Sequence, residues 1–100
     1  MKNDLIELST PGEVLKEEFL DPMGITPYAL AKSIFVDPPR IAAIIKGKRK
    51  ITADTALRLS KFFGNSADFW MNMQSRYELE ILSEEKKQEL SRISRFHKAS

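Results

Sequence analysis

The chain has 100 residues, 42% of them hydrophobic and 30% charged, with a net charge of +2 and no cysteine. This composition suits one small globular domain and excludes disulfides, thiol catalysis and thiolate-bound metal. No apolar run approaches the roughly 20 residues of a membrane span. The first residues lack the basic flank and apolar stretch of a signal peptide, so we expect a cytoplasmic protein without a membrane partner.

The first predicted helix begins at a capping box that follows an N-terminal extension, residues 1–9. Thr10 is the expected N-cap, Pro11 takes the first helical position, where its missing N–H costs nothing, and Glu13 takes the third. Apolar positions then recur at offsets of one, five and six residues, which predicts a core-facing stripe: Val14, Leu15, Phe19 and Leu20. Residues 21–24 (DPMG) are expected to end this helix.

Two further helix starts follow closely. Thr26 and Asp37, each followed by proline, are expected to cap a second and a third helix, and the Asp37 carboxylate should accept an unpaired backbone N–H. The third helix should stop at Gly47 in a left-handed conformation. Only residues 35–37 separate the two helices, which forces a sharp angle between them. Their expected inward positions are Leu30, Ala31, Ile34, Ile41, Ile44 and Ile45.

Thr52 and Ser66 are the expected N-caps of a fourth helix, which stops at Gly64, and a fifth. The fourth helix should turn these side chains inward: Ala56, Leu57, Leu59, Ser60 and Phe63. Residues 83–95 carry Leu90 and Ile93 at helical spacing and form either a helix docked on a partner or a frayed tail. With strand signals nearly absent, we predict an all-α, compact five-helix bundle (residues 10–82) with an additional C-terminal helix and tail (residues 83–100).

The second and third helices have a helix-turn-helix layout, in which the second helix of the pair enters the DNA major groove. Such pairs also occur in many small helical proteins, so charge has to support the assignment. Residues 32–61 hold eight Lys or Arg against two Asp, whereas residues 1–31 hold two against six acids. A solvated face is the alternative for any single cluster, but cations concentrated after the third helix favour binding to double-stranded DNA by counterion release.

Residues 11–82 resemble the HigA/VapI-type antitoxins, which carry a phage-repressor-like helix-turn-helix. The matching stretches are PGEVLKEEFLDPMGIT, YALAKSI, IIKGKRKITADTALRLSKFFG and SADFWMNMQSRYELE. The resemblance implies the antitoxin of a type II toxin–antitoxin system. Such a protein binds a palindromic operator as a homodimer, represses its own operon and neutralises a RelE-like mRNA-cleaving toxin. A stand-alone transcriptional regulator of the same fold, without a toxin partner, is the alternative.

Carried onto this chain, the groove-facing positions are the start and outer side of the third helix: Pro38, Pro39, Arg40, Ala43 and Lys46. The prolines offer no hydrogen bond to base edges, so Arg40 is expected to be the main reader, able to fork onto guanine N7 and O6. Alternatively, Arg40 simply pairs with Asp37. Phosphate contacts are expected from six residues, the last three of which otherwise form a solvated loop: Thr26, Tyr28, Lys46, Lys48, Arg49 and Lys50.

The turn of the motif carries Phe35 where the phage-repressor pattern usually has glycine. A bulky residue at this position either takes a strained left-handed conformation or belongs to a reshaped turn. We expect the Phe35 side chain to pack inward as a core aromatic.

The fifth helix carries Trp70, Met71 and Tyr77, more aromatic and methionine surface than a small monomer easily hides. We assign these residues to a homodimer interface that sets the two recognition helices about 34 Å apart. The alternative is that this stripe simply holds the helix on the bundle's own core.

The first helix is acidic, and its carboxylates complement the basic surface that an RNA-binding toxin requires. A plain solvated helix face is the alternative for these residues: Glu13, Glu17, Glu18 and Asp21. His97 is the only histidine and has no acid at useful spacing, and no H-E-x-x-H, phosphate loop or G-x-S-x-G is present. We therefore expect no enzyme, no cofactor and no metal site.

Overall fold

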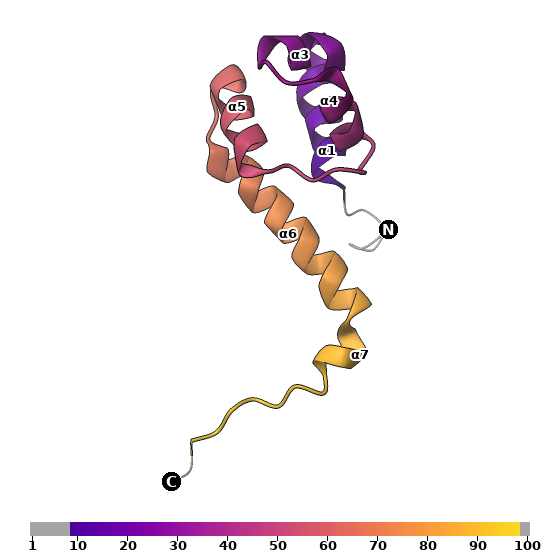
Figure 1. The fold of residues 1–100 in the computed structure, drawn as a ribbon, viewed down its shortest axis with the longest axis vertical. Helices are drawn as coiled ribbons and strands as arrows, with labels where there is room; N and C mark the ends of the chain where they lie inside the picture. The colour runs from indigo at the N-terminus through magenta and orange to yellow at the C-terminus, as the bar shows by residue number, and fades with distance from the viewer. Residues whose placement is uncertain (1–8, 99–100) are drawn as a thin grey trace.

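The computed structural model describes residues 9–98, whose regular elements are all helices, with no strand among them (Figure 1). The helices in chain order are α1 (Pro11–Val14), the π-helix η1 (Leu15–Leu20), α2 (Asp21–Met23), α3 (Pro27–Ser33), α4 (Pro38–Ile45), α5 (Ala53–Phe63), α6 (Ala67–Glu85) and α7 (Lys87–Leu90). The all-α prediction is confirmed. The predicted N-terminal extension lies outside the described residues apart from Ser9, and within residues 9–98 no helix is both long and apolar enough to cross a membrane.

The first helix begins at the predicted capping box. The Thr10 hydroxyl accepts the Glu13 N–H at 3.0 Å, and the Glu13 carboxylate accepts the Thr10 N–H at 3.0 Å. The chain then widens into η1, so that Leu15 and Leu20, five residues apart, are both buried. An α-helix would set these two side chains about 140° apart, which is why the five-residue spacing suits a π-helix. The stop at Gly24, with φ of +69°, matches the predicted end.

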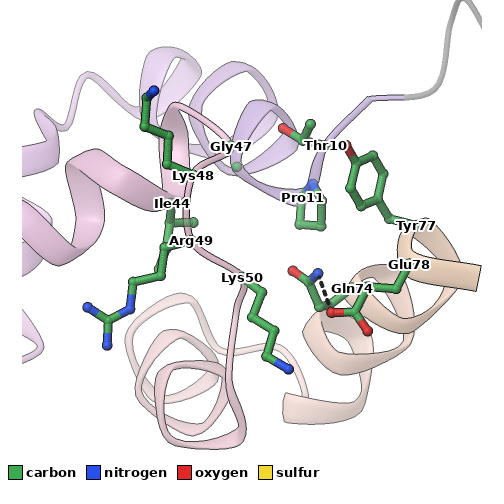
Figure 2. Close-up of a pocket in the computed structure, with 11 residues that line it drawn as sticks. Thr10, Pro11, Ile44, Gly47, Lys48, Arg49, Lys50, Gln74, Tyr77 and Glu78 are labelled. Carbon is green, nitrogen blue, oxygen red and sulfur yellow. Dashed lines mark hydrogen bonds between the residues drawn. The ribbon is translucent and has the colours of Figure 1, made fainter. Parts of the chain in front are cut away.

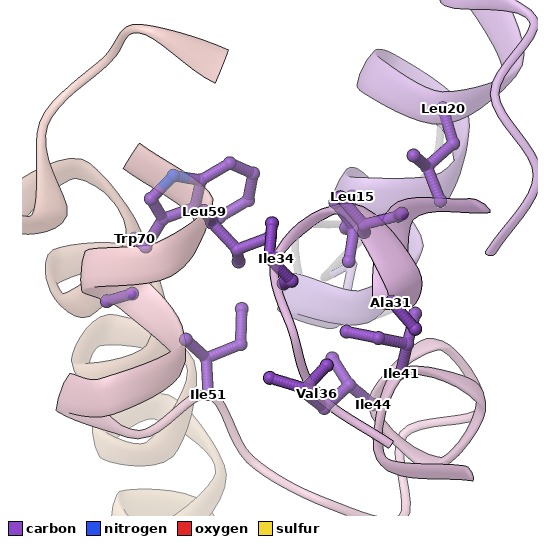
Figure 3. Packing of buried hydrophobic residues seen from close by; sticks show 12 residues of the cluster. Leu15, Leu20, Ala31, Ile34, Val36, Ile41, Ile44, Ile51, Leu59 and Trp70 are labelled. Atoms are coloured by element: carbon purple, nitrogen blue, oxygen red, sulfur yellow. The ribbon is translucent and has the colours of Figure 1, made fainter. Parts of the chain in front are cut away.

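The hydrophobic core lies between η1, α3, α4 and α5 and the start of α6 (Figure 3). Its largest fully buried apolar side chains are Trp70, Leu15, Leu20, Leu30, Ile41, Ile44, Ile51 and Leu59. The inward prediction holds for Leu59, whereas it is wrong for Leu57, which is 59% exposed. Leu57 lies two residues before Leu59 along α5, so the two side chains cannot share one helix face.

Trp70 is 0% exposed within a single chain, so its assignment to a dimer interface is wrong. Its ring packs against Phe19 and Phe63, with centroids 4.9 and 5.9 Å away, and its indole N–H donates to the Asn65 side chain at 3.0 Å. The surface of the Trp70 ring is therefore covered by the bundle itself.

The end of α4 packs closely against α1 at Gly12, which has no side chain. Gly12 is buried, and a Cβ added there would lie 2.8 Å from the Cα of Ile45 and would overlap the Ile44 carbonyl group. Side chains at this position are therefore excluded by backbone atoms that cannot move aside easily. The absence of a side chain at Gly12 sets how closely the end of α4 approaches the start of α1.

Helix α6 is anchored at one end only. Its beginning packs on α5 and α1, and its second half leaves the bundle towards α7 and the C-terminal tail (Figure 1). Exposed apolar side chains lie along this part of α6, on α7 and in the tail: Leu79, Leu82, Leu90, Ile93 and Phe96. The domain boundary predicted between residues 82 and 83 falls inside the continuous helix α6.

Candidate DNA-binding surface

The turn between α3 and α4 depends on Phe35, whose φ is +61°, the only positive φ of a non-glycine residue among residues 9–98. The prediction that its side chain packs inward is wrong, because Phe35 is 86% exposed. Its neighbours Ile34 and Val36 take the buried positions instead, which directs the residue between them to solvent. The left-handed conformation costs a non-glycine residue roughly 1–2 kcal/mol.

Arg58 of α5 forms hydrogen bonds to the backbone of this turn. Its Nη1 donates to the carbonyl oxygen of Ile34 at 2.8 Å and to that of Phe35 at 3.4 Å, and its Nε donates to Oδ2 of Asp54 at 3.0 Å. Carbonyls at the end of a helix have no partner within the helix, and a cation there satisfies them and complements the helix dipole. The strained turn is thus held to α5 by one guanidinium group.

Helix α4 begins without the predicted side-chain cap. Asp37 has extended backbone and occupies the N-cap position, but its carboxylate makes no capping hydrogen bond. Pro38 and Pro39 have no N–H to offer, and the first available one, on Arg40, donates to the Asp37 main-chain oxygen at 2.9 Å. The prediction was wrong because Pro39 removes the second donor of the helix, and the third, the Arg40 N–H, bonds the Asp37 main-chain oxygen in place of its carboxylate.

Arg40 pairs with α5 and not with Asp37. Its Nη1 donates to Oδ2 of Asp54 at 3.0 Å and to the hydroxyl of Thr55 at 3.2 Å, and its side chain remains 27% exposed. Hydrogen bonds from Arg40 and then Arg58 hold the pKa of Asp54 below its ordinary value of 3.8. Sequence reasoning missed this cluster; the four-residue spacing of Asp54 and Arg58 was the available signal.

The loop after α4 is cationic and is tied to α6 by a buried amide. Gln74 accepts the backbone N–H of Ile51 at 2.9 Å and donates to the Glu78 carboxylate at 3.1 Å (Figure 2). Behind the loop lies a cavity of about 230 Å³ that Thr10 and Tyr77 also line. The end of the loop is thereby tied to α6, and its exposed cations are Lys46, Lys48, Arg49 and Lys50.

The remaining residues expected at DNA lie at or near the surface. Thr26 is the N-cap of α3, where its hydroxyl accepts the Ala29 N–H at 3.0 Å, and both Thr26 and Tyr28 are exposed. Pro39 is exposed, whereas Pro38 and Ala43 are half-buried. Their contacts with DNA stay predictions.

The other two predicted surfaces are partly engaged within the chain. Glu13 belongs to the capping box, and Asp21 accepts from Lys16 Nζ at 3.0 Å, whereas Glu17 and Glu18 are exposed. Met71 and Tyr77, assigned to a dimer interface beside Trp70, are half-buried.

Comparison with known proteins agrees with this geometry. The chain matches the helix-turn-helix family model over residues 15–70. It is 51% identical to virulence-associated protein I of Dichelobacter nodosus, over 76% of this chain and 70% of that protein. It is 43% identical to antitoxin HigA-1 of Vibrio cholerae, over 68% of this chain and 64% of that protein. The solved structure of Pseudomonas aeruginosa antitoxin HigA with the higBA promoter is 38% identical, covers 89% of this chain and 98% of its own, and has a TM-score of 0.85. The resemblance found in the sequence is thereby confirmed, and the chain belongs to the helix-turn-helix family of the HigA antitoxins and virulence-associated protein I.

Proposed function

We propose that the chain is a cytoplasmic antitoxin that binds the operator of its own operon as a homodimer, represses that operon and neutralises a RelE-like mRNA-cleaving toxin. The observation that carries the DNA-binding part is the recognition helix α4. It carries a partly exposed arginine, Arg40, in its first turn and is followed at once by the exposed cationic loop of residues 46–50. A similar protein, HigA of Pseudomonas aeruginosa, has been solved with a promoter.

The cationic loop and Arg40 have different proposed roles in DNA binding. Cations of the loop suit phosphate, which gives affinity that falls with added salt and carries no sequence information. Arg40 is the residue of α4 with hydrogen-bond donors suited to guanine, since the prolines before it and Ala43 after it offer base edges only apolar contact. Specificity beyond Arg40 would come from DNA shape and from the symmetry of two half-sites.

The homodimer is supported by the projecting part of α6. Leu79 and Leu82 are exposed there, downstream of the half-buried Met71 and Tyr77. Apolar side chains gathered on a helix that has left its own bundle favour burial against a second copy. We therefore propose an interface on the part of α6 that follows Trp70.

The toxin-binding part is supported by the first helix. Glu17 and Glu18 are exposed and form no ion pair with any of residues 9–98, so their charge is available to a basic partner. Complementary charge of this kind speeds association and is screened by salt.

One experiment separates this proposal from a stand-alone regulator. The purified chain is titrated onto DNA from upstream of its own gene at rising salt, and a tagged form is used to capture the product of the adjacent gene. We expect sequence-preferring binding with a log–log salt slope of about −3 to −4 for each protomer whose four loop cations all meet phosphate, together with capture of a basic protein. DNA binding without capture would favour the stand-alone regulator, and the absence of any sequence preference would remove the DNA-reading role.

A further inference from the structure

We propose that Asp54 and Thr55 are positioning residues for sequence readout, which hold the Arg40 guanidinium by one nitrogen and leave its opposite edge available to guanine. This inference rests on the proposed role of α4 in DNA binding. It assigns a recognition role to two residues of α5 that lie outside the recognition helix.

The geometry of the guanidinium carries the inference. Of the five N–H donors of an arginine, two belong to Nη1, and Nη1 of Arg40 donates to both Asp54 Oδ2 (3.0 Å) and Thr55 Oγ1 (3.2 Å). Nε and Nη2 make no hydrogen bond with any residue from 9 to 98. These two nitrogens present parallel N–H groups, which is the fork that matches guanine O6 and N7. Holding Arg40 and reading a base therefore use different edges of one group.

The two holding residues are themselves fixed. Thr55 is 1% exposed, and Asp54 is also bound by Arg58 Nε at 3.0 Å, one turn further along α5. Arg58 in turn is bound to the carbonyl oxygens of the turn before α4. A long side chain that is ordered before binding loses less rotamer freedom when the ligand arrives. The cluster thus orders the Arg40 side chain in the free protein.

The test measures specificity and affinity separately. A duplex is selected from a random pool with the unmodified protein, and dissociation constants are measured for it and for a shuffled duplex of the same composition. Asp54→Asn removes a negative charge and weakens the hold on Arg40. The specificity ratio is the dissociation constant for the shuffled duplex divided by that for the selected duplex. We expect this ratio to shrink about tenfold in Asp54→Asn, which corresponds to the loss of one well-placed arginine–guanine contact.

Asp68→Asn is the matched control. Asp68 is the second residue of α6 as Asp54 is the second residue of α5, so the substitution removes the same charge from the same helix position. We expect the specificity ratio to stay unchanged in this variant. Thermal unfolding of each variant shows that the comparison is made on folded protein.

A double variant decides whether Asp54 acts through Arg40. In the Arg40→Ala background, Asp54→Asn should change the specificity ratio no further. A further loss in that background would make Asp54 a general support of the turn through Arg58 and would overturn the inference, as would an unchanged or increased ratio in Asp54→Asn alone. If the unmodified protein enriches no sequence from the pool, the proposed DNA-reading function falls and takes this inference with it.

Discussion

Nη1 of Arg40 lies 3.0 Å from Oδ2 of Asp54, and this contact joins the start of α4 to the first turn of α5. The same carboxylate oxygen accepts from Arg58 Nε at 3.0 Å, and Arg58 also holds the turn that precedes α4. One carboxylate therefore connects α4, the turn and α5. The orientation of the proposed reading residue is set by a helix that itself need not enter the groove.

The free energy of unfolding should decrease as the pH is lowered, because the Asp54 carboxylate then becomes protonated. Because hydrogen bonds from Arg40 and Arg58 lower the pKa of Asp54, the unfolded chain binds its proton more readily than the folded chain does. The contribution is therefore complete above the ordinary value of 3.8 and is lost as pH falls through the lower folded value. We expect a difference in free energy of unfolding between the unmodified protein and Asp54→Asn at neutral pH that shrinks below about pH 4.

The measurement is urea unfolding at a series of pH values. A difference that is the same at pH 7 and at the acid end of the series would show that the Asp54 carboxylate does not provide this contribution.

Gly12→Ala should be strongly destabilising. The added methyl group would overlap the Ile44 carbonyl and lie 2.8 Å from the Ile45 Cα, so α1 and α4 would have to separate. Overpacking of this kind costs about 1–3 kcal/mol and more where backbone must move, and we expect the upper end of that range in urea unfolding. Gly24→Ala is the control, because its Cβ would meet nothing within 4 Å and only the backbone conformation opposes it. Equal decreases in the free energy of unfolding in the two variants would contradict the packing role of Gly12.

Phe35→Gly should stabilise the fold. The left-handed backbone of Phe35 costs roughly 1–2 kcal/mol, and its 86% exposed side chain contributes little packing in return. Glycine relieves the strain but loses more backbone entropy on folding, by roughly 0.5–1 kcal/mol, so a gain of about 0.5–1 kcal/mol should remain. Phe35→Ala keeps the strain and serves as the comparison. Should alanine stabilise as much as glycine, the strain at this turn would not be the cause.

Gln74→Leu should loosen the cationic loop. The backbone N–H of Ile51 would lose its buried acceptor at 2.9 Å, and an unsatisfied buried donor costs about 1–3 kcal/mol. We expect lower stability and faster hydrogen exchange at the Ile51 amide, with weaker binding to all DNA sequences alike. If the amide of Ile51 exchanges no faster in the variant, the tie between the loop and α6 is not formed through Gln74.

Local signals in the sequence located most helix ends correctly. Thr10, Thr26 and Thr52 cap helices as expected, and Gly24 and Gly64 end them in left-handed conformations. These signals work because a cap or a stop is decided within a few residues of backbone. The five-residue apolar spacing from Leu15 to Leu20 is also visible in the sequence, and the structure shows that it belongs to a π-helix and not to the expected α-helix.

Some of the errors are local, as at Leu57 and Asp37, whereas those at Trp70 and Arg40 concern contacts between elements. Periodicity shows that Trp70 needs burial, but it does not tell the chain's own core from a partner's surface, since both exclude water. Phe35 has the same apolar character, yet the backbone of the turn directs it outward. The Arg40–Asp54 contact spans 14 residues and exists only because α5 returns alongside the start of α4. Such contacts depend on how helices pack, which local pattern does not encode.

The decisive measurement is binding to the selected duplex with single guanines replaced by 7-deazaguanine, which lacks the N7 acceptor. If Arg40 reads guanine from the start of α4, the unmodified protein should lose about tenfold in affinity at one guanine of each half-site. Arg40→Ala should bind the natural and the substituted duplex equally. Sequence readout through Arg40 would be contradicted if every 7-deazaguanine that lowers the affinity of the unmodified protein lowered that of Arg40→Ala equally. It would also be contradicted if no 7-deazaguanine lowered the affinity at all.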